Sequence, residues 1–438
     1  MMADSMPILG CEEMKMVENL LGELSLEKIA NLVENTLYEM KLNKVLLIHP
    51  DYTRQDFSDK LVPLIYKQLK TMGMKEFHTL NASGTHRAMS EIEIREKLGL
   101  FEEEFTFFNH EYANPDALVN VGFLSREFVS EKTLGDLKQP LPVTLNKLFF
   151  EKYDLIIVLS GTSPHESTGF SGGLKSIIPG IAGPDVVGLF HWAAVLIGIP
   201  RIIGSLNNPA RDVINEACRV AFEKIRSPII FFNMVYEETD HGIVPKGLYT
   251  GSGYEGALNA YEMAVRASEK IHIIYLDKPV KKAVQVIGKN YDEIWTAGKG
   301  SYKLQRPGVI VPGGEIIIYA PHIRIFHSNK QMDKAIRAVG YHCKDYVKEF
   351  LKTHPEFDLN VASHVINVRG DGKFDPATRK EEFAFNVVLA TAIPKEECEA
   401  VGLSYLDPKS IKKEDFQSPD CLWIEHGGKF LYDLKKEA

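Results

Sequence analysis

The chain has 438 residues, of which 45% are hydrophobic and 25% are charged, a composition typical of a globular protein with length for two or three domains. Its formal net charge of -8 does not favour nucleic acid or an anionic membrane as a partner. The sequence has no run of 18 apolar residues, and residues 1–11 lack the basic start and apolar core of a signal peptide. We therefore expect no membrane span and a cytoplasmic location.

The cysteines are scattered, and no two of them have the C-x-x-C spacing of a zinc or redox site. The sequence therefore predicts neither a cysteine metal site nor a disulfide framework, and this usage fits a reducing compartment. The five cysteines are Cys11, Cys218, Cys343, Cys398 and Cys421.

Two successive strand–loop–helix units are predicted after a helix within residues 24–40. In the first unit, a strand at 44–48 leads into a polar loop at 49–54. Ser58 is expected to cap the helix that follows, which should end near Met72.

The second unit has a strand at 76–80, a polar loop at 81–87 and a helix opened by a capping box at 90–93. Successive units of this kind give parallel strands with right-handed crossovers. The polar loops of both units should therefore lie at the same edge of one sheet.

An apolar run at 155–159 predicts a buried strand near the centre of this sheet. The loop after it is polar and rich in glycine, and it ends on Lys175. Loops at the carboxyl ends of parallel strands bind ligands in open α/β sheets, and a glycine-rich backbone can approach a phosphate closely. The side chains expected to meet at this edge are Asp51, Arg54, His86, Arg87, His165 and Lys175.

A phosphate-binding P-loop is an alternative interpretation of the segment 169–176. The motif requires glycine immediately before the lysine, but Leu174 occupies that position. Pro179 would also fall in the first turn of the helix that the motif requires. The match therefore fails where the backbone has to wrap the phosphate.

The rest of the chain predicts an α/β fold in two parts. We expect an N-terminal domain of residues 1–268 with a Rossmann-like parallel sheet, a C-terminal α/β domain of residues 269–438, and a cleft between them. Residues 125–140 are interpreted as a surface insertion. Helices are predicted at 192–199, 208–224 and 254–270, and strands at 228–236, 271–276, 283–287, 363–369 and 383–391, with further strands at 308–312 and 315–319 flanking a turn at Gly313-Gly314.

The polar loops combine cations with histidines. An arginine fork and a lysine would hold a carboxylate, and histidines on opposite sides of a carbon atom suit proton transfer at either face. The residues themselves indicate an enzyme that acts on a small anion by histidine acid–base chemistry, a pattern shared by racemases, epimerases and dehydrogenases. The candidates are His86, His165, His191, Arg54, Arg87, Lys175 and Lys299.

These residues lie in motifs that resemble the nickel-pincer nucleotide lactate racemase family, over most of residues 44–301. The matching motifs are Asp51-Tyr52-Thr53-Arg54, Gly84-Thr85-His86-Arg87, Pro164-His165, the run from Gly169 through Gly172, Gly173 and Lys175 to Pro179-Gly180, and finally His191.

The resemblance implies a role for each of them. Lys175 would tether the nickel-pincer mononucleotide, with Asp51, Thr53, Gly172 and Gly173 beside it, and His191 would bind nickel. His86 and His165 would be the paired bases while hydride moves reversibly between C2 of a 2-hydroxy acid and the cofactor. The residues implied for substrate binding are Arg54, Arg87, Trp295, Thr296 and Lys299. Proteins that make the cofactor are implied partners.

The family pattern is broken shortly before Lys299, where Trp295 and Thr296 stand in place of a Tyr-Gln pair. The chain after about residue 313 also matches the lactate enzyme poorly. We therefore expect an epimerase for a 2-hydroxy acid larger than lactate, for example an aldonate such as gluconate. The candidate hydroxyl partners are His322, Arg324 and His327. A short-chain, lactate-type racemase and a non-catalytic nickel-binding homologue are the alternatives.

Overall fold

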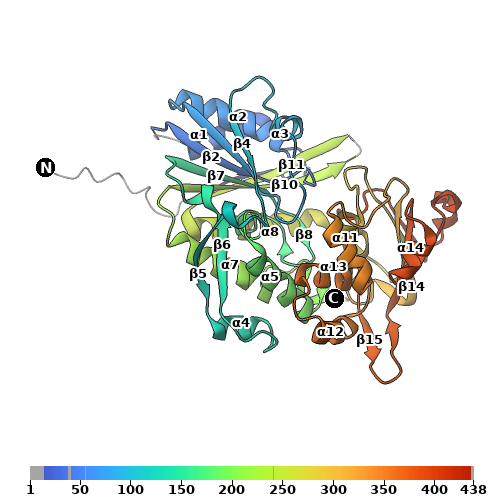
Figure 1. The fold of residues 1–438 in the computed structure, drawn as a ribbon. Helices are drawn as coiled ribbons and strands as arrows, with labels where there is room; N and C mark the ends of the chain where they lie inside the picture. Colours follow the sequence, from blue (N-terminus) through green and yellow to red (C-terminus); the bar gives the residue numbers. More distant parts are fainter. Residues whose placement is uncertain (1–13, 38–40, 55, 240, 436–438) are drawn as a thin grey trace.

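The computed structural model describes residues 14–37, 41–54, 56–239 and 241–435 (Figure 1). The expected entry segment at 1–13, the end of the first predicted helix at 38–40, and Cys11 lie outside the described residues. The fold is α/β, as predicted, and is built around two sheets.

The larger sheet has seven strands in the order β1-β11-β10-β7-β2-β3-β4. Strands β10, β7, β2, β3 and β4 run parallel, whereas β11 pairs antiparallel with both β10 and β1. The bounds are β1 Lys15–Glu18, β2 Lys44–His49, β3 Glu76–Asn81, β4 Thr106–Asn109, β7 Leu155–Gly161, β10 Ile229–Thr239 and β11 Gly242–Ser252. The predicted strand at 155–159 is therefore central, and every residue of β7 is buried.

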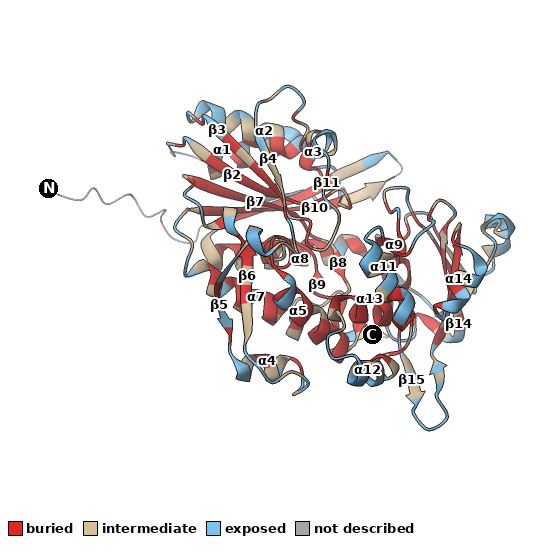
Figure 2. Ribbon diagram, in the orientation of Figure 1, coloured by how far each residue is buried: buried red, intermediate tan, exposed pale blue. Residues whose placement is uncertain are grey.

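Helices cover both faces of this sheet, and its central strands are buried (Figure 2). The buried strand residues alternate between the two faces. Val45 and Leu47 of β2 pack on one face with α1 Leu26–Thr36, α2 Ser58–Thr71 and α3 Glu91–Leu98. Leu46 and Ile48 pack on the other face with α5 Pro184–Ile197, α7 Pro209–Phe222 and α8 Gly253–His272. This alternation is the period of two that strand geometry imposes.

Of the two predicted helix caps, one is confirmed and the other is wrong. The capping box is confirmed, because the Ser90 side chain accepts from the backbone of Glu93 and the Glu93 side chain accepts from the backbone of Ser90. The expected cap at Ser58 is wrong, since α2 begins at that residue. Asp56 accepts hydrogen bonds from the backbone N–H and the hydroxyl of Ser58 instead.

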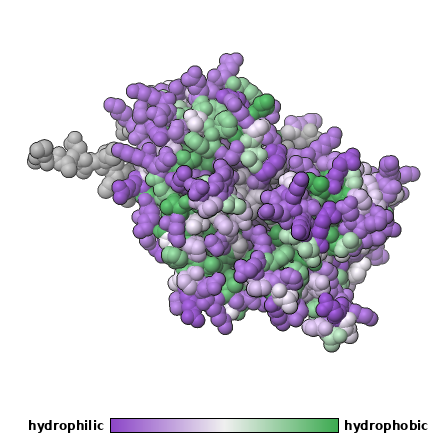
Figure 3. All heavy atoms as spheres, viewed as in Figure 1, coloured by the Kyte–Doolittle hydropathy of each residue, from purple (hydrophilic) through white to green (hydrophobic). Residues whose placement is uncertain are grey.

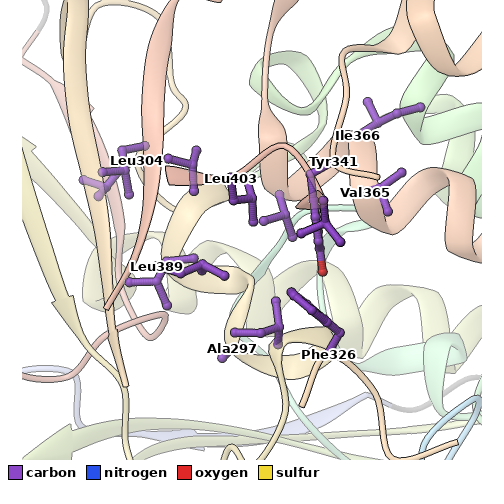
Figure 4. Close-up of a cluster of buried hydrophobic side chains, with 14 of the residues drawn as sticks. Ala297, Leu304, Phe326, Tyr341, Val365, Ile366, Leu389 and Leu403 are labelled. Atoms are coloured by element: carbon purple, nitrogen blue, oxygen red, sulfur yellow. The ribbon is translucent and has the colours of Figure 1, made fainter. Parts of the chain in front are cut away.

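The smaller sheet has the order β18-β17-β14-β13-β19, and all its strands run parallel. Its strands are β13 Val280–Val286, β14 Ile310–Ala320, β17 Phe385–Thr391, β18 Ser404–Tyr405 and β19 Cys421–Ile424. The helices α11 Lys330–Val339, α12 Lys344–Thr353 and α13 Leu359–Arg369 lie beside it. Figure 4 shows part of the hydrophobic core of this region, where Phe326, Tyr341 and Val365 meet Leu389 and Leu403.

Three sequence predictions are wrong in this region and near it. Residues 310–320 form one strand, because the pairing between β13 and β14 shifts around the predicted turn and keeps both flanks in the sheet. The predicted strand at 363–369 is part of helix α13, which begins after Asp358 caps the backbone N–H of Asn360. His191, expected to precede a helix, lies inside α5.

The two sheets are connected by α8, which continues to His272 and so passes the expected boundary at 268/269. The short strand β12 Ile273–Leu276 then pairs with β20 Leu431–Leu434 near the C-terminus. Helix α13 also packs on α5, which brings the second half of the chain against the first. The division into two domains at this boundary remains a prediction.

The remaining elements are short. The segment 125–140 contains α4 Arg126–Lys132 and lies between the paired strands β5 Leu118–Leu124 and β6 Leu141–Asn146. The others are β8 Pro164–His165, β9 Gly169–Phe170, α6 Ile199–Ile202, α9 Ile294–Ala297, α10 Lys299–Tyr302, β15 Gly372–Asp375, β16 Lys380–Phe383, α14 Lys395–Ala400 and the 3-10 helices η1 Pro115–Ala117, η2 Lys147–Phe150, η3 Gly173–Ser176, η4 Pro408–Ser410 and η5 Lys413–Phe416. Hydrophilic residues dominate the face shown in Figure 3. Among the described helices, none combines the length and the apolar character needed to cross a membrane.

Candidate functional site

A cavity of about 190 Å³ lies at the carboxyl ends of β2, β3 and β7. Its lining also includes residues of α5, α9, α10 and α13, so both halves of the chain contribute to it. The parallel strand order therefore brings the predicted loops together, as we inferred from the repeated strand–loop–helix order. The predicted residues that line the cavity are Asp51, Thr53, Arg54, His86, His165, Gly172, Lys175, His191, Trp295, Thr296 and Lys299.

His86 and Asp51 form a close pair on neighbouring loops. Nδ1 of His86 donates to Oδ2 of Asp51 at 2.5 Å, and the hydroxyl of Thr53 donates to the other carboxylate oxygen at 2.6 Å. Burial raises the pKa of Asp51, but the charge of His86 and these hydrogen bonds outweigh it and hold the pKa well below its usual range. The carboxylate thus fixes the His86 ring with its proton on Nδ1 and leaves Nε2 free to accept one.

His165 lies on the short strand β8 and is buried. Its Nδ1 accepts a hydrogen bond of 3.2 Å from the backbone N–H of Ser167. Burial, and then the nearby charges of Lys175 and Arg54, lower its pKa well below the ordinary value. The neutral ring therefore has its proton on Nε2, the opposite arrangement to that of His86.

Glycines shape the loop that leads to Lys175. Gly172 has φ +91°, and a Cβ there would lie 2.5 Å from the hydroxyl oxygen of Thr162. Gly173 lies behind the lining with φ +60°, and its N–H donates to Oδ1 of Asn233 at 2.9 Å. Lys175 follows in η3, and burial lowers its pKa to about 7, so that the amine is a nucleophile near neutral pH. Only a four-residue 3-10 helix starts here, which differs from the helix of a P-loop.

His191 faces the same cavity from α5. Its Nδ1 donates to Oδ1 of Asn360 at 2.7 Å, and burial lowers its pKa to about 4. The neutral ring is therefore held with a free lone pair on Nε2, the arrangement expected of a metal-binding histidine. Nowhere in the described part of the chain do three or more His, Cys, Asp or Glu side chains form a metal site. A metal bound at His191 would therefore need its other ligands from a cofactor. Lys175 lines the same cavity and could anchor such a cofactor, so the two residues fit a nickel-pincer group.

Arg87 is the one predicted substrate-binding residue outside the lining. Its guanidinium makes two hydrogen bonds to the Glu93 carboxylate, at 2.7 and 3.1 Å, and lies over the ring of Tyr52. These contacts occupy the fork that a substrate carboxylate would need, so the Arg87 guanidinium is not available to bind substrate.

The histidines suggested as hydroxyl partners also lie outside the lining. Nε2 of His322 contacts the backbone oxygen of Tyr291 at 2.8 Å, and Arg324 is exposed on the surface. His327 is buried behind Trp295, with 4.9 Å between the ring centroids.

Several lining residues are absent from the sequence predictions. Most belong to the second half of the chain, where no motif and no predicted strand end marks them. The main ones are Glu166, Tyr291, Lys303, Asn360, His364 and Lys429. The only available signal was the position of Lys303 one helical turn after Lys299.

Part of the chain is similar in sequence to known proteins. Residues 12–198 match the family described as the lactate racemase N-terminal domain. The N-terminal part of the chain is thus similar to the lactate racemase family. It is 29% identical over 219 residues to the lactate racemase of Thermoanaerobacterium thermosaccharolyticum and 27% identical over 206 residues to that of Lactiplantibacillus plantarum. These alignments cover 49% and 46% of this chain but only 46% and 43% of the two relatives, so less than half of each relative is matched.

Solved structures extend the likeness to the whole chain. The apoprotein of the Thermoanaerobacterium thermosaccharolyticum lactate racemase superposes with a TM-score of 0.63 at 20% identity, covering 94% of this chain and 90% of that one, which shows a shared fold. A Thermotoga maritima protein solved by a structural genomics consortium is far more similar. It is 57% identical with a TM-score of 0.94, over 96% of this chain and all of that one.

Proposed function

We propose that this protein inverts the configuration at C2 of a 2-hydroxy acid, using a nickel-pincer nucleotide attached to Lys175. The observation that carries the proposal is that His86, His165, Lys175 and His191 line one cavity. Inversion requires a proton-transfer group on either side of the substrate and an anchored cofactor beside it. The two histidines His86 and His165 can serve the first need, and Lys175 with His191 the second.

Cofactor binding would use residues of the first half of the chain. When bound, the nickel-pincer nucleotide would supply the hydride acceptor beside the substrate carbon. Lys175 would hold it covalently, and Nε2 of His191 would bind nickel, for which imidazole is a suitable ligand. Gly172, three residues before the lysine, lines the same cavity. Proteins that make this cofactor are then required partners.

The two histidines differ in a way that suits acid–base work. With Nδ1–H directed to Asp51, His86 offers the lone pair of Nε2 to the substrate hydroxyl proton. His165 offers an Nε2–H, because its Nδ1 accepts from Ser167. One ring can therefore accept a proton while the other donates one, and these roles exchange when the opposite configuration is the substrate.

The substrate carboxylate would be held by Arg54 and Lys299. Both line the cavity, and neither has a carboxylate within 4.0 Å among the described residues, so both are available to an incoming anion. A guanidinium fork with a second point charge is a common carboxylate site.

A substrate larger than lactate is favoured by the polar lining near Trp295. Thr296, Ser363, His364 and Asn367 all face the cavity and can bond to hydroxyl groups of a longer chain. We therefore place an aldonate such as gluconate ahead of lactate. A short-chain, lactate-type racemase is the second candidate, favoured by the two curated relatives.

Turnover of lactate, malate and gluconate by nickel-loaded holoprotein tests the proposal. Epimerisation of gluconate at C2, followed by chiral chromatography, is the expected result. Exclusive turnover of lactate would exclude the larger substrate. A holoprotein that carries a mononucleotide adduct on Lys175 by intact mass yet turns over none of the three would favour a non-catalytic nickel-binding homologue.

A further inference from the structure

Cations are crowded in this cavity beyond what one carboxylate requires. Five of them line it, and only Lys429 has a carboxylate within 4.0 Å among the described residues, since it pairs with Glu238 at 2.6 Å. The other four are Arg54, Lys175, Lys299 and Lys303. If the proposed function is right, Lys175 is consumed by the cofactor, and Arg54 and Lys299 hold the C1 carboxylate. Lys303 then has no anionic ligand group assigned to it.

Lys303 is a buried cation with an incomplete set of hydrogen-bond acceptors. The residue is 3% exposed, and its ammonium group donates to the backbone oxygen of Pro164, the residue before His165. An ammonium group has three N–H donors, and a buried one without a counter-ion is costly. Burial lowers the pKa of Lys303 to about 7, Glu166 opposes that shift, and the charge of Lys299 adds to it.

Lys299 and Lys303 reach different walls of the cavity, although they are one turn apart on the chain. Nζ of Lys299 lies 4.3 Å from the ring centroid of Tyr291, whereas Lys303 contacts the loop that carries His165. Burial raises the pKa of Tyr291, but Lys299, Lys429 and Arg54 lower it to about 7, so three cations act on this wall of the cavity. Two separated cationic positions suit a ligand with an anionic group at each end.

We propose that the substrate carries a second anionic group at the end remote from C1, and that Lys303 binds it. This inference rests on the proposed function and narrows it from hydroxy acids in general to hydroxy acids with two anionic groups. A terminal carboxylate or a terminal phosphate would supply the same chemistry. An ammonium-to-anion hydrogen bond in a buried site is stronger than one between neutral groups, so the charged end should be clearly preferred.

Gluconate and glucarate form a matched pair for the test, because they share a six-carbon hydroxylated chain and differ at C6 as CH₂OH or carboxylate. With wild-type holoprotein, we expect kcat/KM for C2 epimerisation and calorimetric affinity to favour glucarate by about tenfold or more. A comparison of erythronate 4-phosphate with erythronate tests whether a terminal phosphate can be the second anionic group. Equal affinity within each pair would overturn the inference and leave the proposed function intact. Turnover of none of the four would count against the proposed function itself.

Lys303→Met should reduce kcat/KM for glucarate at least tenfold more than for gluconate, and Lys303→Arg should restore most of that preference. If the role of Lys303 were purely structural, Lys303→Met would lower kcat/KM equally for both substrates, and this result would contradict the inference. Lys270→Met, at an exposed position on α8, is the control for loss of a lysine. The intact mass of each variant shows whether the cofactor is attached. Loss of the adduct in Lys303→Met alone would assign the second anion to the cofactor and overturn the proposal. If Lys303→Met fails to fold, the comparison of glucarate with gluconate on the wild-type holoprotein still tests the inference.

Discussion

Asn360 accepts a hydrogen bond of 2.7 Å from Nδ1 of His191, and this contact joins helix α13 to helix α5. Asn360 is itself held, because its amide nitrogen donates to the hydroxyl of Tyr112 at 3.1 Å. The amide oxygen is therefore directed at the imidazole, and the second half of the chain fixes the orientation of a histidine in the first half.

Asn360→Leu should weaken nickel binding while leaving the cofactor attached. Removing the acceptor frees the His191 ring to rotate, and loss of such a supporting partner typically costs about 10- to 100-fold in metal affinity. Metal analysis of the purified holoprotein, combined with intact mass, measures both quantities. Asn360→Asp is the matched control, since it keeps an acceptor oxygen. Full nickel occupancy in Asn360→Leu would contradict the positioning role.

Asp51→Asn should lower the rate of epimerisation with little effect on the attached cofactor. The amide cannot hold the Nδ1–H tautomer of His86 as the carboxylate does, so that less of the ring offers Nε2 as a base. We expect a loss of about 10²-fold or more in kcat, on the scale of general acid–base catalysis. Steady-state kinetics on holoprotein of verified adduct mass make the comparison. Thr53→Val, which removes only the hydroxyl bond to Asp51, should have a smaller effect.

His86→Ala and His165→Ala should each abolish interconversion, because inversion needs proton transfer on both sides of the substrate carbon. The expected loss is about 10²- to 10⁴-fold for either variant. Chiral chromatography starting from each epimer gives the two directions separately. His322→Ala, outside the cavity lining, is the control. Full activity in either single variant would refute the two-base mechanism.

The stability of the apoprotein should rise with pH because of Lys175. Burial lowers the pKa of this lysine from its ordinary value of 10.5 to about 7. Between these values the unfolded chain binds the proton and the folded chain does not, so the free energy of unfolding rises as pH rises from about 7. Lys175→Met should therefore raise Tm most near or below pH 7, and the gain should shrink by pH 10. Thermal melts across this pH range measure the effect, and Lys270→Met is the control at an exposed lysine. A rise in Tm for Lys175→Met that did not depend on pH would contradict the lowered pKa of Lys175.

Local patterns in the sequence predicted the first half of the site well. The capping box at Ser90, the apolar run of β7 and the repeated strand–loop–helix order were sufficient to place Asp51, His86 and Lys175 at one edge of a sheet. Parallel strands with short polar loops allow this inference, because all their carboxyl ends meet on the same side.

The second half was predicted less well for a physical reason. Every residue of α13 from Asn360 to Arg369 is buried, so that helix has no exposed face, and its polar and apolar residues do not mark a helical period. Its valines and isoleucine favour a strand when the sequence is considered alone. The glycines Gly313 and Gly314 predicted a turn, but β14 continues through them because its pairing with β13 shifts register there.

The sequence alone thus determined the α/β class, the parallel order of the first strands and several of the residues that line the cavity, because strand alternation, helix caps and motif spacing are local properties of the chain. Only the tertiary structure decided that Arg87 is engaged by Glu93, that Asn360 orients His191, and that Lys303 and Lys429 enter the cavity. These contacts join residues far apart in the chain, and they depend on how α13 and the second sheet pack against α5, which no local pattern encodes.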